Sequence, residues 1–204
     1  MNNLGFVKEN SALLIIDMQN GFMHPEGSLP KMGLDCSRTL KVIDPIKKLK
    51  SVCIENSIPV IYLMHTHRPD GLDAGMIANV FPPIMQLGHC FEGTFDQEII
   101  SELTPVSSDI IVKKHRFSGF YNTQLDEVLR SLNVNQLIVC GIATNICVES
   151  TIRDAFYRDF NVFVPFESTA AFTEEQEQGS FGNFGFAFAR LLTLDEMISK
   201  IENK

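Results

Sequence analysis

The stretch VCGIATNICVEST, residues 139–151, joins an apolar run of strand character to the first turn of a helix. Cys147 lies just past the join, in a helix start that Thr144 or Asn145 would cap. There the helix macrodipole and the free N–H groups of the first turn favour a thiolate. Cysteine is also among the most often buried residues, so two interpretations stand: a packed thiol or a reactive one.

The same alternation of strand and helix extends outward from this stretch. Runs that are apolar throughout predict strands at residues 12–17, 59–65, 109–114, 136–142 and 161–166. Amphipathic segments predict helices at residues 42–56, 96–103, 123–133 (capped by Asn122 or Thr123), 145–160, 175–192 and 194–202. Fully apolar strands separated by helices are typical of a parallel sheet that helices cover on both faces.

The composition is that of one globular domain spanning residues 1–204, with 45% hydrophobic residues and no linker-like segment. The net charge is −8 and no basic stripe is present, which argues against nucleic acid and anionic membrane surfaces as partners. The apolar runs are too short to span a membrane. The polar N-terminus MNNLGFVKEN lacks the apolar segment of a signal peptide, so we expect a cytoplasmic protein with reduced thiols.

Three chemically active side chains fall at the carboxyl ends of predicted strands. Asp17 ends the first strand, Lys113 and Lys114 end the third, and Cys147 follows the fourth. Open parallel α/β sheets bind their ligands beyond this edge of the sheet. We therefore expect a carboxylate, an ammonium and a thiol to lie close together there.

Each of the three also has a structural interpretation. Asp17 could cap a turn, and Lys114 could be a solvated strand end. However, an Asp that ends an apolar strand is costly to bury without a cation or a donor, so the combination is more informative than any single residue. The remaining cysteines are expected to be packing residues: Cys36, Cys53, Cys90 and Cys140.

Together the three side chains supply what cysteine-based acyl transfer needs. A thiol of ordinary pKa is only slightly ionised at neutral pH, so Asp17 would accept its proton and Lys114 would hold negative charge near the sulfur. Two backbone N–H groups in the turn GIATNIC would stabilise an oxyanion, at about 3 kcal/mol per donor. The chemistry indicated is attack on an amide carbonyl, followed by hydrolysis of a thioester.

Three blocks of the sequence resemble the signature blocks of the isochorismatase-like cysteine hydrolases. They are IIDMQNGF (residues 15–22), KKHRFSGFYNTQLD (113–126) and CGIATNICVESTIRDAF (140–156). This family includes nicotinamidases, N-carbamoylsarcosine amidohydrolase, ureidoacrylate amidohydrolase and biuret hydrolase. The resemblance implies a Rossmann-like three-layer α/β/α sandwich with a mostly parallel six-stranded sheet, and a homodimer or homotetramer.

The resemblance also assigns roles by position. It implies that Asp17 is the general acid/base, Lys114 the catalytic lysine and Cys147 the nucleophile. It further implies a cis peptide between Ile142 and Ala143, with the N–H groups of Ala143 and Cys147 as the oxyanion hole. Substrate-binding positions are expected at Phe22, Gln19, Arg116, Phe120 and Tyr121.

Two features separate the branches of this family. Isochorismatases commonly lack the nucleophilic cysteine, so Cys147 favours hydrolysis of a C–N bond. Nicotinamidases bind a metal through an Asp-x-His pair after the second strand, whereas His65 stands here in place of the Asp, two residues before His67. These histidines, with His89 and Cys90, could hold zinc, but loop histidines are more often hydrogen-bonded. We therefore expect no metal and no cofactor.

The blocks around Arg116 and Cys147 are closest to the ureidoacrylate and carbamoyl-amide branch, which indicates a small ureido, carbamoyl or carboxamide substrate and release of ammonia. The alternatives are a metal-assisted nicotinamidase, a redox thiol with Cys140 as its partner, and a non-catalytic scaffold. The Gly- and Pro-containing loop at residues 66–93 is expected to shape the pocket. The phenylalanine-rich segment at residues 179–192 is consistent with an interface.

Overall fold

The computed structural model describes residues 5–203. Its sheet contains the strands β1 (Ser11–Ile16), β2 (Val60–His65), β3 (Ile110–Lys114), β4 (Gln136–Ile142), β5 (Asn161–Pro165), β6 (Thr169–Ala170) and β7 (Arg190–Leu192). The strand order is β3-β2-β1-β4-β5-β7, with β6 paired to β4, and all of these pairs are parallel. The predicted parallel α/β sheet is confirmed, and its strand number is corrected from six to seven.

The helices follow the strands in alternation. The α-helices are α1 (Asn20–Met23), α2 (Ser28–Lys31), α3 (Ser37–Leu40), α4 (Ile43–Glu55), α5 (Ile77–Val80), α6 (Pro82–Gln86), α7 (Leu125–Ser131), α8 (Glu149–Phe156), α9 (Glu174–Asn183) and α10 (Leu194–Ile201). Short 3₁₀ turns are η1 (Lys8–Asn10), η2 (Phe95–Gln97), η3 (Ser101–Leu103) and η5 (Phe166–Ser168), and π-helical turns are η4 (Thr144–Val148) and η6 (Phe184–Phe188). No helix within residues 5–203 is long and apolar enough to cross a membrane.

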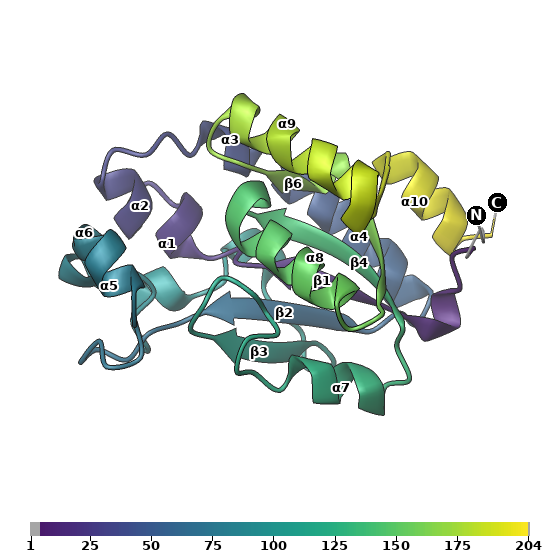
Figure 1. The fold of residues 1–204 in the computed structure, drawn as a ribbon, viewed down its shortest axis with the longest axis horizontal. Helices are drawn as coiled ribbons and strands as arrows, with labels where there is room; N and C mark the ends of the chain where they lie inside the picture. Colours follow the sequence, from purple (N-terminus) through teal and green to yellow (C-terminus); the bar gives the residue numbers. More distant parts are fainter. Residues whose placement is uncertain (1–4, 204) are drawn as a thin grey trace.

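Helices cover both faces of the sheet, as the fully apolar strands require. All six residues of β1 are buried, and its side chains alternate between two cores, because successive residues of a strand point to opposite faces. Leu13 and Ile15 pack with α4 and α10 on one face. Leu14 and Ile16 pack with α7 and α8 on the other. Figure 1 shows the sheet between these two helical layers.

Two of the predicted helices are wrong in part, because their backbones pair with other segments of the chain. Residues 96–103 form only the turns η2 and η3, because the segment between them bonds to the chain after β1: Ile99 bridges Gln19. Residues 190–192, at the end of the helix predicted over 175–192, form β7, which pairs with β5. Tertiary pairing overrides local helical preference in both places. The helix predicted from residue 123 begins at Leu125, whose N–H donates to Thr123 Oγ1.

Four short helices gather at one end of the sheet. In Figure 1, α1, α2, α5 and α6 lie beyond the carboxyl end of β2, and α10 lies at the opposite end. Helices α5 and α6 belong to the loop at residues 66–93. The loop and the strand ends therefore meet where a parallel sheet places its ligands.

Candidate active site

Asp17 leaves the end of β1 in a conformation that turns the chain out of the sheet. Its φ is +52°, in the left-handed region that Asp tolerates better than most residues. Its N–H still donates to the carbonyl of Leu63 in β2, at 2.9 Å, which fixes the residue at the strand end. Its side chain is completely buried. A buried carboxylate in this position requires a partner of opposite charge.

Lys114 is that partner, and its neighbour Lys113 is not. The two residues alternate across edge strand β3, so Lys113 points outward to pair with Glu92 while the side chain of Lys114 is completely buried. Lys114 Nζ donates to Asp17 Oδ2 at 2.8 Å and to the carbonyl of Arg116 at 3.2 Å. The sequence-based choice of Lys114 over Lys113 agrees with this geometry.

Burial and the neighbouring charges together shift the pKa of both members of this ion pair. Burial raises the pKa of Asp17 above its ordinary value, although Lys114 and Cys147 lower it in part. The pKa of Lys114 is also raised: burial opposes the ammonium, and the charge of Asp17 together with Cys147 favours it. Asp17 is thereby a stronger base than an exposed carboxylate, and Lys114 stays protonated at neutral pH.

Cys147 completes the cluster from the turn that follows β4. It lies in the π-helical turn η4, where the N–H of Val148 reaches back to the carbonyl of Ala143, at 3.2 Å. The expected capping role of Thr144 or Asn145 is wrong, because Ala143 precedes the turn and neither side chain bonds to a helix N–H. π-Helical turns occur often at functional sites.

The thiol of Cys147 interacts with both charged groups. Burial is the main reason that its pKa lies well above the ordinary value; Asp17 raises that pKa further and Lys114 lowers it. Asp17 Oδ1 has no hydrogen-bond partner of ordinary geometry, which leaves this oxygen for the thiol proton. Transfer of that proton gives a neutral acid and a thiolate beside Lys114. The net charge of the buried cluster does not change, so burial does not prevent the transfer.

The backbone between β4 and η4 adopts the geometry that the resemblance implied. The Ile142–Ala143 peptide is cis. Gly141 before it has φ +112°, and a Cβ atom there would lie 2.1 Å from the carbonyl oxygen of Ile16, so only glycine fits. Ala143 and Cys147 both border the cavity described next. Their N–H groups remain the proposed oxyanion donors.

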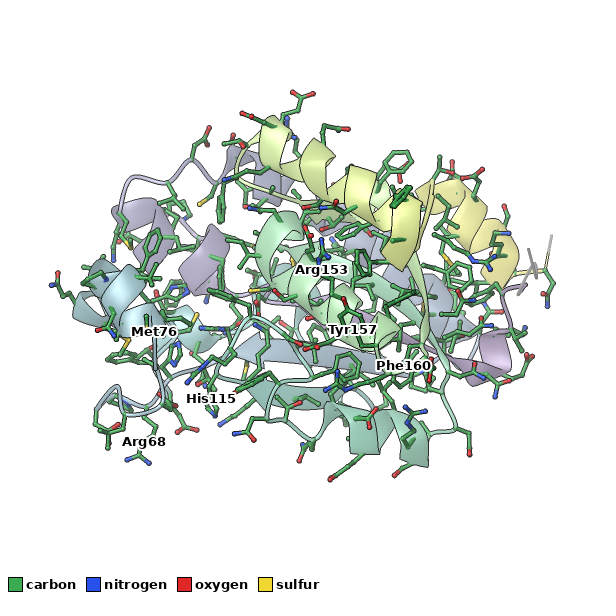
Figure 2. All side chains as sticks on the ribbon, in the orientation of Figure 1. Arg68, Met76, His115, Arg153, Tyr157 and Phe160 are labelled. Carbon is green, nitrogen blue, oxygen red and sulfur yellow. The ribbon has the colours of Figure 1, made fainter. Side chains whose placement is uncertain are left out.

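A cavity of about 550 Å³ borders the Cys147 thiol. Phe22 of α1 lines it, and the loop at residues 66–93 contributes Ile77 and Ile84, as expected. Figure 2 shows Met76, another lining residue, at the end of the molecule that also carries Arg68 and His115. The thiol therefore faces a space large enough for a small organic substrate.

Four of the five predicted substrate contacts lie outside this lining, and only Phe22 is part of it. The amide of Gln19 is fully used in tying the chain to backbone atoms of His65 and Gln97. Arg116 donates to the carbonyls of Asp73 and His115 instead of reaching the cavity. Gln19 therefore ties the chain after β1 to β2 and η2, and Arg116 fixes the loop at Asp73.

The two aromatic predictions in the segment after β3 are also corrected. Phe120 packs on Phe160 in the core between the sheet and α8, and Tyr121 is 59% exposed. Phe117 borders the cavity instead, from the same block. Ile146 borders it too, directly before Cys147. Ile146 could have been predicted to line the cavity, because it directly precedes Cys147 at the helix start. Nothing in the sequence pattern distinguishes Phe117 from Phe120.

A chain of hydrogen bonds leads from Lys114 through two histidines. Nδ1 of His65 lies 3.4 Å from Lys114 Nζ, and because an ammonium only donates, this nitrogen accepts. Burial lowers the pKa of His65 well below its usual value, so the ring is neutral and its Nε2 carries the proton. That nitrogen lies 2.9 Å from Nε2 of His67. Both Nε2 atoms are therefore engaged with each other.

One group of side chains could be considered for a metal ion. Ligand atoms of His67, Asp73 and His115 lie within 4.8 Å of one another. This group differs from the set considered from the sequence, because Asp73 and His115 replace His65, His89 and Cys90 beside His67. However, Nδ1 of His115 donates to the carbonyl of Thr66 at 2.8 Å and so carries a proton. A ligand from this ring would therefore have to be Nε2, and we derive no catalytic step through an ion.

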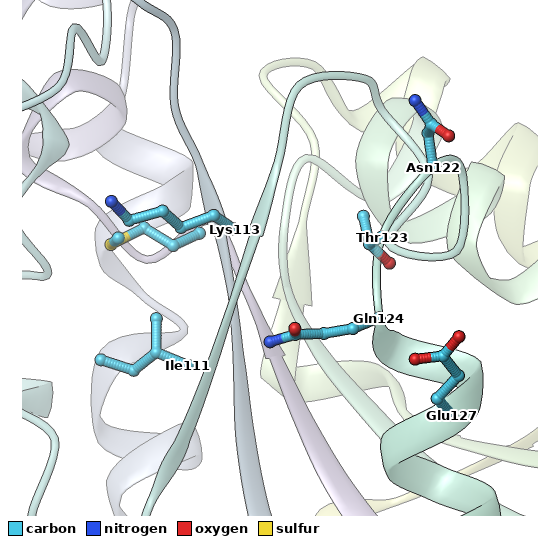
Figure 3. Close-up of a pocket in the computed structure, with 7 residues that line it drawn as sticks. Ile111, Lys113, Asn122, Thr123, Gln124 and Glu127 are labelled. Carbon is cyan, nitrogen blue, oxygen red and sulfur yellow. The ribbon is translucent and has the colours of Figure 1, made fainter.

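A second, more open groove lies on the other side of β3. Figure 3 shows Ile111 and Lys113 of the strand on one side of it, and Gln124 and Glu127 at the start of α7 on the other. Its lining contains none of Asp17, Lys114 and Cys147. The groove is therefore separate from the candidate site.

The comparisons with known proteins agree with this geometry. Residues 11–196 match the family model of the isochorismatase domain. Ureidoacrylate amidohydrolase RutB of Cronobacter sakazakii is 36% identical over 77% of this chain and 73% of its own length. A cysteine hydrolase from Pseudomonas syringae pv. phaseolicola superposes with a TM-score of 0.90 at 33% identity, covering 98% of this chain and 96% of its own. N-carbamoylsarcosine amidase from Thermoplasma acidophilum gives a TM-score of 0.76 at 28% identity, covering 91% and 97%. This chain belongs to the isochorismatase family.

Proposed function

We propose that this isochorismatase-family hydrolase, which acts on C–N bonds, cleaves a small carbamoyl, ureido or carboxamide substrate through a thioester on Cys147 and releases ammonia. The observation that carries the proposal is the completely buried ion pair of Asp17 and Lys114 beside a thiol that borders a cavity. A buried pair of this kind is costly for stability alone, and here it supplies the base and the cation that a cysteine nucleophile needs.

The first half of the reaction forms the acyl-enzyme. Asp17 accepts the thiol proton, and Lys114 stabilises the thiolate as it attacks the carbonyl carbon. The N–H groups of Ala143 and Cys147 bind the developing oxyanion, each contributing about 3 kcal/mol. Asp17 returns the proton to the amide nitrogen, the C–N bond breaks, and ammonia leaves. The product is a thioester, or a thiocarbamate when the substrate is a ureido compound.

The second half releases the acyl group. Water enters where ammonia left, and Asp17 accepts one of its protons as the oxygen attacks the acyl carbon. The C–S bond breaks, the thiolate recovers its proton from Asp17, and the acid or carbamate departs. Asp17 therefore acts first as a base and then as an acid in each half of the reaction.

The names of the relatives support the choice of the bond that is cleaved. One is named a ureidoacrylate amidohydrolase and the other an N-carbamoylsarcosine amidase, and both names describe hydrolysis of an amide-type C–N bond. The redox alternative has no geometric support, because Cys140 packs in the core on the opposite face of the sheet from Cys147. The scaffold alternative leaves the buried charged cluster without a purpose.

An ammonia-release assay tests the proposal. The panel contains ureidoacrylate, N-carbamoyl compounds, aliphatic carboxamides and nicotinamide, and the control is Cys147→Ala. Ammonia from at least one compound with wild type, and none with the variant, is expected. A disulfide formed only with peroxide, without ammonia, would favour the redox alternative instead.

The dimer or tetramer implied by the family remains part of the proposal. Phe186 in η6 is 93% exposed, and Phe156 at the end of α8 and Tyr157 directly after it are exposed as well. Exposed aromatic residues are typical of surfaces that contact a partner. Light scattering of the purified chain, compared with Phe186→Ser, would show whether this surface joins two copies.

A further inference from the structure

We propose that the cavity beside Cys147 takes an uncharged, largely apolar substrate and discriminates against substrates that carry a carboxylate. This inference rests on the proposed function, because it describes the group attached to the carbonyl that Cys147 attacks. It goes beyond that function in naming which chemical class of amide or ureido compound the site accepts.

The walls of the cavity come from separate parts of the chain and are apolar in each. Phe22 and Leu29 line it from α1 and α2, Ile77 and Ile84 from the loop that contains α5 and α6, and Phe117 and Phe172 from the segments after β3 and β6. The rim is apolar too, since Val80 and Phe81 are exposed at it. Apolar walls of this extent favour an apolar ligand by the area that is removed from water.

No cationic side chain is available among the described residues that line the cavity. The nearest buried ammonium, Lys114, is paired with Asp17 and enclosed completely. The guanidinium of Arg116 is directed to the carbonyls of Asp73 and His115. A carboxylate on the substrate would therefore lose its hydration without gaining a partner of opposite charge.

The two histidines in the lining do not replace the missing cation. His65 accepts a hydrogen bond from the ammonium of Lys114, and so that nitrogen carries no proton. His89 is almost completely enclosed, bonds to Ser28 Oγ through Nδ1, and has a pKa lowered by burial to about 3. Both rings are neutral at the pH at which a carboxylate substrate is ionised.

Acidic residues adjoin the polar part of the lining along the chain. Thr173 and Gln176 line it at the start of α9, and the first turn of that helix carries Glu174, Glu175 and Glu177. The N–H groups of a helix start would otherwise attract an anion, but these carboxylates oppose it. The guanidinium of Arg38 is already paired with Glu177, at 2.9 Å.

Matched substrate pairs test the inference. Hexanamide is compared with adipamate, and hexylurea with ω-ureidohexanoate, so that each pair differs chiefly in a terminal carboxylate. Because an unpaired buried carboxylate is strongly disfavoured, we expect kcat/KM to be about 100-fold higher for the uncharged member of each pair. Binding of the same compounds to Cys147→Ala, measured by calorimetry, should show the same preference in Kd.

A charge introduced into the lining sharpens the test. Gln176→Arg places a guanidinium at the cavity and should reduce the preference for the uncharged member by about 10-fold. Gln178→Arg is the matched control, because Gln178 is exposed on the same helix and lies outside the lining. The control adds the same net charge and should leave the preference unchanged.

The outcomes separate this inference from the proposed function. Equal or better turnover of the carboxylate members would overturn the inference and leave the hydrolase function standing. Ammonia from none of the compounds, with no binding to Cys147→Ala, would overturn both. An equal change in preference in both arginine variants would show that overall charge, and not the cavity lining, selects the substrate.

Discussion

Cys140 and Cys147 lie seven residues apart in one strand-to-helix segment, and both are buried, with 0% and 4% exposure. Burial raises the pKa of both thiols. The difference lies in their neighbours. Cys140 points from the middle of β4 into a core, where its sulfur hydrogen bonds to the carbonyl of Leu14. Cys147 lies beyond the strand end, beside Asp17 and Lys114. Burial alone therefore does not distinguish a packing thiol from a reactive one.

The contrast extends to the whole sheet. Interior positions of a parallel sheet are enclosed by helices on both faces, so their side chains can only pack. Positions just past the carboxyl ends leave the strand geometry, which allows their side chains to converge from different strands. Asp17 after β1, Lys114 at the end of β3 and Cys147 after β4 meet in this way. The candidate active site therefore lies at the carboxyl ends of the strands, where side chains of different types converge.

The largest expected effect separates the two cysteines directly. Cys147→Ala should reduce kcat/KM to less than about a hundredth, because no other group can form the acyl-enzyme. Cys140→Ala should keep activity within about threefold and lower the free energy of unfolding by about 1 kcal/mol. Steady-state kinetics and urea unfolding measure the two quantities. Comparable activity losses in both variants would remove the distinction.

The next effect separates two adjacent lysines. Lys114→Ala should reduce kcat/KM by about 100-fold, since it removes the cation beside the thiolate and leaves the Asp17 carboxylate buried without a partner. Lys113→Ala should stay within about twofold, because Lys113 points outward to Glu92. Both variants need a circular dichroism spectrum to confirm folding. Similar losses of activity in the two variants would contradict the assignment of Lys114, and not Lys113, to the site.

A smaller effect concerns the stability of the sheet edge at low pH. The folded-state pKa of His89 lies near 3, below its unfolded value of 6.5, so its contribution to stability is complete above pH 6.5 and is lost as the pH falls toward 3. Between pH 7 and pH 5 this amounts to about 2 kcal/mol. Urea unfolding at the two pH values measures the decrease in the free energy of unfolding. That decrease should be smaller by this amount in His89→Gln than in the wild type. An identical pH dependence in both proteins would contradict a buried neutral His89.

The smallest expected effect is that of chelation. Activity should remain within about twofold after exhaustive treatment with a chelator, because thiol activation is assigned to Asp17 and Lys114. This assignment uses none of the side chains in the group of His67, Asp73 and His115. Assays before and after chelation, with zinc, manganese or iron added back, check this. Loss followed by recovery with one metal would favour the metal-assisted nicotinamidase alternative.

The sequence was sufficient to predict a parallel sheet and the convergence of Asp17, Lys114 and Cys147. These features depend on local apolar runs and on which residue ends each run. It was not sufficient for β7 or for the turns at residues 95–103, where pairing with distant backbone decides the structure. It also could not choose between Phe117 and Phe120. Their placement depends on how the segment after β3 packs, and local periodicity carries no information about that.

The most direct test of the account locates the acyl group on the enzyme. p-Nitrophenyl hexanoate has a good leaving group, so acylation should be fast and the hexanoyl-enzyme should accumulate with a burst of p-nitrophenol. After acid quench, mass spectrometry of peptides should find the hexanoyl group on Cys147 and none on Cys140. A hexanoyl group on any other residue, or no burst from protein that hydrolyses hexanamide, would contradict the assignment of Cys147 as the nucleophile.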